Sequence, residues 1–111
     1  MTHGLNKIMI IGCVGREPEM RYTPGGRPVT SFSVATGRTW MTPDGRRHRE
    51  TDWFNVVSWG DTAEICKQRV AKNQRVYVEG RLQTRGWKDS LGKSHYRAEI
   101  VASEVLILDQ S

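Results

Sequence analysis

The chain alternates between short apolar runs and turn residues, which predicts strands joined by loops. An apolar, β-branched run from Leu5 to Val14 predicts a first strand that is buried on both faces or bent at Gly12. Residues 29–36 then alternate between apolar and small or polar positions, so that Phe32 and Val34 share one face. These two segments indicate a sheet with a buried side.

Residues 51–59 predict a strand with two different faces. Alternation places on one face Trp53, Asn55, Val57 and Trp59, and on the other Phe54, Val56 and Ser58. Two tryptophans therefore share a face with an amide, while the opposite face supplies core.

One helix is predicted directly after this strand. Asp61 has the character of an N-cap, with Glu64 three residues later, and Asn73 is a plausible stop. Helical spacing relates Ala63, Cys66 and Val70. This is the only good helix signal in the sequence.

From Arg75 onward the period returns to two. The inward positions are Val76, Val78, Gly80, Leu82 and Thr84, and the outer, largely basic stripe is Tyr77, Glu79, Arg81, Gln83, Arg85 and Trp87. Gly80 predicts a bulge or bend. A turn at residues 89–92 leads into a strand from His95 to Ala102, and a last strand runs from Glu104 to Leu108. Five or so strands with one helix before the fourth predict an all-β, closed or partly closed barrel.

Composition narrows the class of protein. The chain has 111 residues, a size that indicates a single domain over residues 1–111, and its formal net charge of +5 favours a polyanionic partner. Every apolar run is far shorter than the ~20 residues of a membrane-spanning helix. The stretch from Ile8 to Ile11 is shorter than the ~7–15 residues of a secretory signal, so a cytoplasmic protein is expected. Cys13 and Cys66 are expected to be reduced, buried thiols.

The tryptophans carry the functional signal. The chain has 4 Trp and only 2 Phe, and each tryptophan lies in polar or basic sequence: Trp40, Trp53, Trp59 and Trp87. Arginines outnumber acids between residues 16 and 49, as Lys and Arg do between 67 and 97. Aromatic rings stack on exposed bases and cations pair with phosphates, so the pattern favours single-stranded nucleic acid with little sequence preference. The alternative is that one or two tryptophans belong to the core.

Catalysis is not expected. The three histidines, His3, His48 and His95, lie far apart and beside no nucleophile, and no carboxylate grouping resembles a two-metal nuclease site. We therefore expect no catalytic residue, no metal and no cofactor. A metal-dependent nuclease is the most distant alternative.

Several segments resemble bacterial single-stranded-DNA-binding proteins. They span residues 6–26, 32–36, 52–60, 63–65 and 76–87, within a match from about Leu5 to Leu108. The resemblance implies a five-stranded Greek-key barrel of the oligonucleotide/oligosaccharide-binding (OB) fold, with one short helix between the third and fourth strands and extended hairpin loops. It also implies a homotetramer that coats single-stranded DNA in replication, repair and recombination, in the cytoplasm at the nucleoid.

The same resemblance assigns roles to residues. It implies base stacking by Trp40, Trp53, Trp59 and Trp87, and phosphate contacts by Lys7, Arg21, Lys72, Arg85 and Lys88. Phe54 stands where the family often has a histidine at a subunit contact, so the assembly is expected to differ in strength, and a dimer remains an alternative to the tetramer.

The sequence departs from the family at its end. Family members usually continue into a Gly/Pro/Gln-rich linker and an acidic tip that recruits partner proteins, whereas this sequence stops at residues 108–111. Recruitment of replication and repair proteins is therefore not expected. The open alternatives are a tail-less primosome-type or plasmid-borne accessory relative, a piece trimmed to its core, and an RNA-binding module of the same fold.

Overall fold

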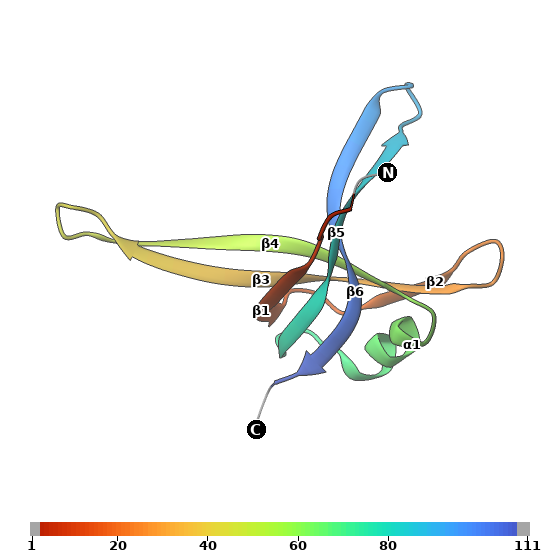
Figure 1. The fold of residues 1–111 in the computed structure, drawn as a ribbon, viewed down its shortest axis with the longest axis horizontal. Coiled ribbons are helices and arrows are strands. Elements are labelled where there is room, and N and C mark those ends of the chain that lie inside the picture. Colours follow the sequence, from red (N-terminus) through yellow and green to blue (C-terminus); the bar gives the residue numbers. More distant parts are fainter. Residues whose placement is uncertain (1–2, 109–111) are drawn as a thin grey trace.

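Strands dominate the protein (Figure 1). The structure, a computed structural model, describes residues 3–108. Residues 109–111, part of the chain end discussed above, lie outside the described residues. The elements are β1 (Ile8–Val14), β2 (Glu19–Tyr22), β3 (Pro28–Met41), β4 (Arg47–Trp59), α1 (Gly60–Arg69), β5 (Arg75–Lys88) and β6 (Ser94–Ile107).

Five of the strands close into a barrel. The sheet order is β1-β5-β6-β4-β3-β2, and β1 closes the ring by pairing with β3 at Cys13 and Val14. β4 and β6 run parallel, with Val56 opposite Ile100, and the other pairs are antiparallel. The predicted barrel with a short helix before the strand at Arg75 is confirmed. The short edge strand β2 was not predicted, so the helix lies between β4 and β5.

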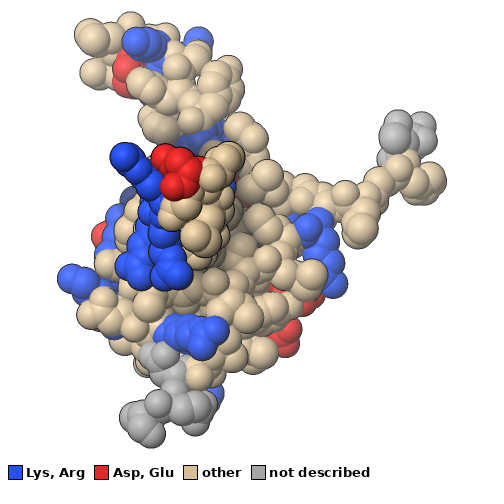
Figure 2. Space-filling model, turned by 90° about the vertical axis from the view of Figure 1, so that its left-hand side faces the viewer, with Lys and Arg blue, Asp and Glu red and all other residues tan. Residues whose placement is uncertain are grey.

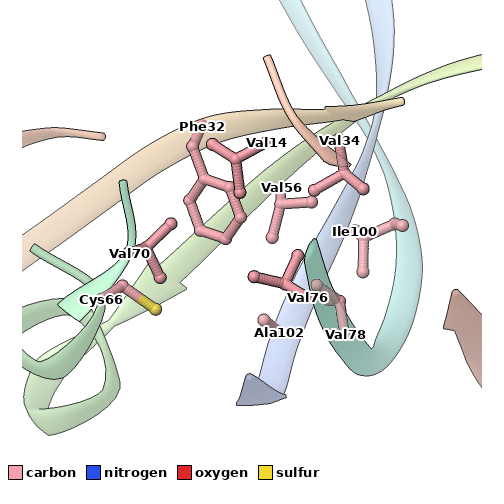
Figure 3. Close-up of a cluster of buried hydrophobic side chains, with 10 residues drawn as sticks. All are labelled: Val14, Phe32, Val34, Val56, Cys66, Val70, Val76, Val78, Ile100 and Ala102. Atoms are coloured by element: carbon pink, nitrogen blue, oxygen red, sulfur yellow. The ribbon is translucent and has the colours of Figure 1, made fainter. Parts of the chain in front are cut away.

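The barrel interior is filled by aliphatic side chains and one phenylalanine (Figure 3). Phe32 lies toward Cys66, which belongs to α1, and toward Val70, which directly follows α1. Val34 and Ile100 lie at the other end of the cluster. The helix is fixed to the sheet by Thr30, whose hydroxyl donates a 2.7 Å hydrogen bond to the carbonyl of Ala63. The predicted core faces are confirmed at Phe32, Val34, Val56, Ser58, Val76 and Val78, all of which are buried.

Two glycines let strands approach closely where the barrel bends. A Cβ at Gly12 would lie 2.3 Å from the carbonyl oxygen of Ala35, and one at Gly80 would lie 2.1 Å from that of Val101. The β5–β6 register shifts between Glu79 and Gly80, which confirms the predicted irregularity at Gly80.

Two hairpins extend beyond the barrel (Figure 1). We call residues 37–51 the β3–β4 arm and residues 81–98 the β5–β6 arm. The inward positions predicted along β5 are wrong past Gly80, since Leu82 and Thr84 are exposed. At that point β5 has left the barrel, and neither face of the arm has a core to cover.

Three further local predictions are wrong. The N-cap of α1 is Trp59, without a side-chain hydrogen bond, and Asp61 lies inside the first turn. The helix ends at Arg69, and Asn73 lies in the turn that follows, where its φ of 73° places it in the left-handed region. The two strands predicted after residue 94 form one strand, β6, because the irregularity opposite Gly80 bends the strand without ending it.

The prediction of a buried Cys13 is also wrong. Cys66 is fully buried, and burial raises the pKa of its thiol, but Cys13 is exposed. Cys13 shares the outward face of β1 with Met9 and Ile11, which are exposed as well.

Candidate nucleic-acid interface

A groove of about 380 Å³ lies on the outside of the barrel. Its walls come from β2, β3, β4, β5 and β6, and arginines outnumber carboxylates along it. The charged lining residues are Arg16, Arg21, Arg85 and Arg97, with Glu19 and Glu99. The groove is therefore a cationic channel that crosses several strands.

Strand alternation brings three tryptophans to the side of the barrel that holds this groove. Trp53 and Trp59 share the outward face of β4 with Asn55, which lines the groove. On β5, Gln83 and Arg85 line the groove, and Trp87 continues the same face into the β5–β6 arm. Their cross-strand partners on β6 are Glu99, Arg97 and His95.

Each indole on this side rests on a specific neighbour. Trp53 is 61% exposed and lies against Gly15, where a Cβ would fall 2.3 Å from its Cζ3 atom. Trp59 is half-buried, and the guanidinium of Arg27 lies over its ring at 4.9 Å from the centroid. A cation at this distance over the face of an indole ring is attracted to the ring electrostatically. Both rings are held in place while part of each stays accessible.

The two arms carry the same aromatic arrangement. On the β3–β4 arm, Trp40 stacks on His48 with ring centroids 5.6 Å apart. On the β5–β6 arm, Trp87 stacks on His95 with centroids 5.5 Å apart. An arginine two residues before each tryptophan lies over the indole: Arg38 at 5.4 Å and Arg85 at 5.7 Å. Trp40 is 42% exposed and Trp87 is 43% exposed, so both remain open to a ligand.

Trp40 is not brought to the face that holds Trp53. It pairs with His48, whereas Trp53 pairs with Ala35, and β3 and β4 pair without a register shift between these positions. Alternation therefore puts Trp40 and Trp53 on opposite faces of the two-stranded ribbon. A ligand that touched both would have to pass around the β3–β4 arm.

The five predicted phosphate-binding residues fall into two groups. Arg21 and Arg85 line the groove, and Lys88 lies at the end of β5 in the adjacent arm. Lys7 forms an ion pair with Glu79, with Nζ 3.1 Å from Oε2, and Lys72 follows α1, where its backbone N–H donates to Glu17. Lys7 and Lys72 do not line the groove.

The Lys7 ion pair belongs to a small network on the outside of the barrel. Tyr77 donates a hydrogen bond to the Glu79 carboxylate, which raises the pKa of Tyr77 to about 12 and, together with Lys7, lowers the pKa of Glu79. The carboxylate is therefore charged at neutral pH, and a phosphate that reached Lys7 would compete with it.

The β3–β4 arm carries charges of both signs. Figure 2, which looks at the molecule from the side of this arm, shows basic side chains gathered on its near end with acidic side chains against them; the positively charged residues of the arm are all arginines. Arg38 pairs with Glu50 and with Asp52, whose Oδ2 lies 3.1 Å from the arginine Nε, and Arg46 pairs with Asp44 at 3.5 Å. These pairs hold Arg38 next to Trp40.

Phe54 lies away from the groove. It faces inward from β4, opposite Val34, and is half-buried against the core.

Across residues 3–108, no three His, Cys, Asp or Glu side chains lie together as a metal site would require. No helix in that part of the chain is long and apolar enough to cross a membrane.

Five residues that contact the tryptophans were not predicted from the sequence: Gly15, Arg27, Arg38, His48 and His95. A signal for the two histidines was present. Pairing residues outward from the turns at residues 42–46 and 89–93 puts Trp40 opposite His48 and Trp87 opposite His95. Gly15 lies directly after the first predicted strand, and no pattern in the sequence marks it as a contact of an indole ring.

Comparisons with known proteins agree with this architecture. A family model described as the Single-strand binding protein family matches residues 5–108. The chain is 42% identical over 109 residues, 97% of its length and 67% of the relative's, to Single-stranded DNA-binding protein 1 of Chlorobaculum tepidum. Its fold is similar to that in a Plasmodium falciparum SSB complex with ssDNA, with a TM-score of 0.91, 33% identity and coverage of 98% of this chain and 99% of that one. It is also similar to the single-stranded DNA binding protein of Thermus aquaticus, at a TM-score of 0.84 and 29% identity, covering 98% of this chain and 53% of that one.

Proposed function

Because the chain belongs to the single-strand binding protein family, we propose that it binds and coats single-stranded DNA along the groove. The observation that carries the proposal is the row of accessible indoles beside a cationic channel on one side of the barrel. Unpaired bases expose π-faces that duplex DNA hides, so this surface suits single strands.

The tryptophans supply base stacking in this proposal. Trp53 and Trp59 receive bases on the barrel, and Trp87 receives one on the β5–β6 arm. Trp40 extends the path to the other face of the β3–β4 arm, where a strand that wraps the arm would meet it. Every base has a π-face, so stacking of this kind has little sequence preference.

The phosphates are neutralised by basic residues along the path. Arg21 and Arg85 act within the groove, and Lys88 acts where the strand passes the β5–β6 arm. Lys7 and Lys72 contact phosphates where the strand leaves the groove, and Lys7 must first separate from Glu79. Neutralisation releases counterions, so binding weakens as salt is added.

The proposed role is binding without catalysis, by residues 1–111 as one domain, in replication, repair and recombination. The corresponding location is the cytoplasm, at the nucleoid. Labelled single strands incubated with the protein and Mg²⁺ or Mn²⁺ should remain intact, and cleavage would favour the nuclease alternative.

We propose that the protein also assembles with itself, as a homotetramer. The outward face of β1 exposes Met9 and Ile11, at 61% and 49%, and Leu106 on β6 is exposed nearby across β5. β1 pairs with β3 only at Cys13 and Val14, so most of β1 has no strand partner on that side. Exposed apolar sheet faces mark interaction surfaces. Light scattering distinguishes the tetramer from the dimer, and a dimer would favour an accessory relative. Phe54 stays a predicted subunit contact, which only the part of its half-buried ring left uncovered by the core could make.

Competition for fluorescently labelled oligo-dT tests the choice of polymer. We expect unlabelled oligo-dT to displace the probe at lower concentrations than either duplex DNA or oligo-U. Displacement by duplex DNA at the same concentration would contradict stacking on unpaired bases. Stronger displacement by oligo-U would favour the RNA-binding alternative, because the 2′-hydroxyl is the group that separates the two polymers.

A further inference from the structure

Two carboxamide side chains line the groove, and an arginine engages the oxygen of each. Arg97 Nη2 donates to Asn55 Oδ1 at 2.6 Å, and Arg81 Nη1 donates to Gln83 Oε1 at 3.3 Å. A guanidinium group is a donor only, so the amide atom that it contacts must be the oxygen. The two arginines therefore fix the orientation of both amides and leave their NH₂ groups for other partners.

These NH₂ groups have no acceptor among residues 3–108. The Nε–H of Arg97 is also buried without an acceptor in that part of the chain. The carboxylate of Glu99, which is 5% exposed, already faces Arg85, with Oε2 3.6 Å from Nε. The groove therefore contains hydrogen-bond donors that no acceptor among the described residues satisfies.

The position of Asn55 brings its amide next to the stacking surfaces. Asn55 lies two residues from Trp53 and four from Trp59 on the same outward face of β4. A base stacked on either indole directs its edge along this face. The NH₂ group of Asn55 therefore lies on the face along which we expect a stacked base to present its edge.

We propose that Asn55 and Gln83 donate hydrogen bonds to carbonyl oxygens on base edges, so that the groove prefers bases with a carbonyl group over adenine. Thymine, cytosine and guanine each carry at least one such oxygen. Adenine carries none, and its exocyclic amine is itself a donor. The inference rests on the proposed binding of single-stranded DNA and adds a base preference to it.

Oligonucleotides that carry adenine or hypoxanthine at the same positions of one sequence test this proposal. Hypoxanthine is a purine of the same ring size, with a carbonyl oxygen in place of the adenine amine. We expect the wild-type protein to bind the hypoxanthine strand about 3- to 10-fold more tightly, the effect of one hydrogen bond. Asn55→Ala and Gln83→Ala should each bring this ratio toward one. Gln68→Ala, which removes an exposed carboxamide on α1 that does not line the groove, should leave the ratio unchanged.

Two results would overturn the inference while leaving the proposed function intact. One is a wild-type ratio near one. The other is a ratio that neither variant changes, even if overall affinity falls, because the amides would then contact phosphates. Using two variants keeps the test decisive if one of them fails to fold. Failure of the wild-type protein to bind either strand would instead overturn the proposed function.

Discussion

The indole of Trp53 lies against the backbone of Gly15, at a distance that leaves no room for a side chain there. A Cβ at residue 15 would fall 2.3 Å from Cζ3 and 2.9 Å from Cη2 of Trp53, and 2.8 Å from Oγ of Ser33. The loop after β1 therefore seats a ring that is 61% exposed. In our account this contact sets the position of one stacking surface.

Gly15→Ala should displace the Trp53 ring and weaken binding of single-stranded DNA. We expect a loss of up to the ~1–3 kcal/mol of one stacked base, measured by fluorescence anisotropy. Gly37→Ala is the matched control, because a Cβ at Gly37 meets nothing within 4 Å. Equal affinities for the two variants would contradict the seating role of Gly15.

Trp53→Ala and Trp87→Ala should each weaken binding by about 1–3 kcal/mol without unfolding the protein. Trp53 is 61% exposed and Trp87 is 43% exposed, and neither ring belongs to the buried core, so their loss leaves the core intact. Anisotropy titrations measure the affinity, and thermal melting followed by circular dichroism measures the stability. Loss of folding in either variant would mean that the ring is structural.

The core faces could be predicted because they alternate over a continuous buried stretch. Phe32 and Val34 on β3, and Val76 and Val78 on β5, are apolar positions separated by one residue, and burial enforces that period. The arms could not be predicted in this way. Residues 37–41 and 47–51 are exposed on both faces, so no apolar period marks them as strand.

Composition and resemblance single out the four tryptophans, but they do not predict the surroundings of these residues. Arg27 over Trp59 is a contact between the turn before β3 and the end of β4, and no sequence spacing predicts it. The opposite orientations of Trp40 and Trp53 follow from counting along β4, but only once that strand is known to extend back to Arg47.

Arg21→Ala and Arg85→Ala should each make binding less sensitive to salt. Each phosphate neutralised in a single strand contributes about −0.7 to the slope of log K against log salt, so each variant should lose about that amount. Lys67→Ala is the control with the same change in charge, because its Nζ donates to the carbonyl of Pro18 and the residue does not line the groove. Equal slopes in all three variants would show that only net charge matters.

Asp89→Asn should lower the stability of the β5–β6 arm at neutral pH. Hydrogen bonds from His95, Lys93 and Leu91 hold the pKa of Asp89 below its usual value. A carboxyl group whose pKa is lowered by folding stabilises the fold above its unfolded pKa and loses this effect as the pH falls through its folded pKa. The difference in Tm between wild type and variant should therefore stay constant down to about pH 5 and shrink as the pH falls from about 5 to about 2. A difference that stays constant over this range would contradict the assignment, and Ser90→Ala in the same turn should show no such trend.

Titration with oligo-dT, followed by intrinsic tryptophan fluorescence, tests the central claim most directly. Bases that stack on Trp53, Trp59 and Trp87 should quench the emission strongly at low salt. Added salt should reverse the quenching, because its cations compete with the basic side chains for the phosphates. Unchanged emission at low salt, under conditions where anisotropy reports binding, would contradict stacking on these tryptophans.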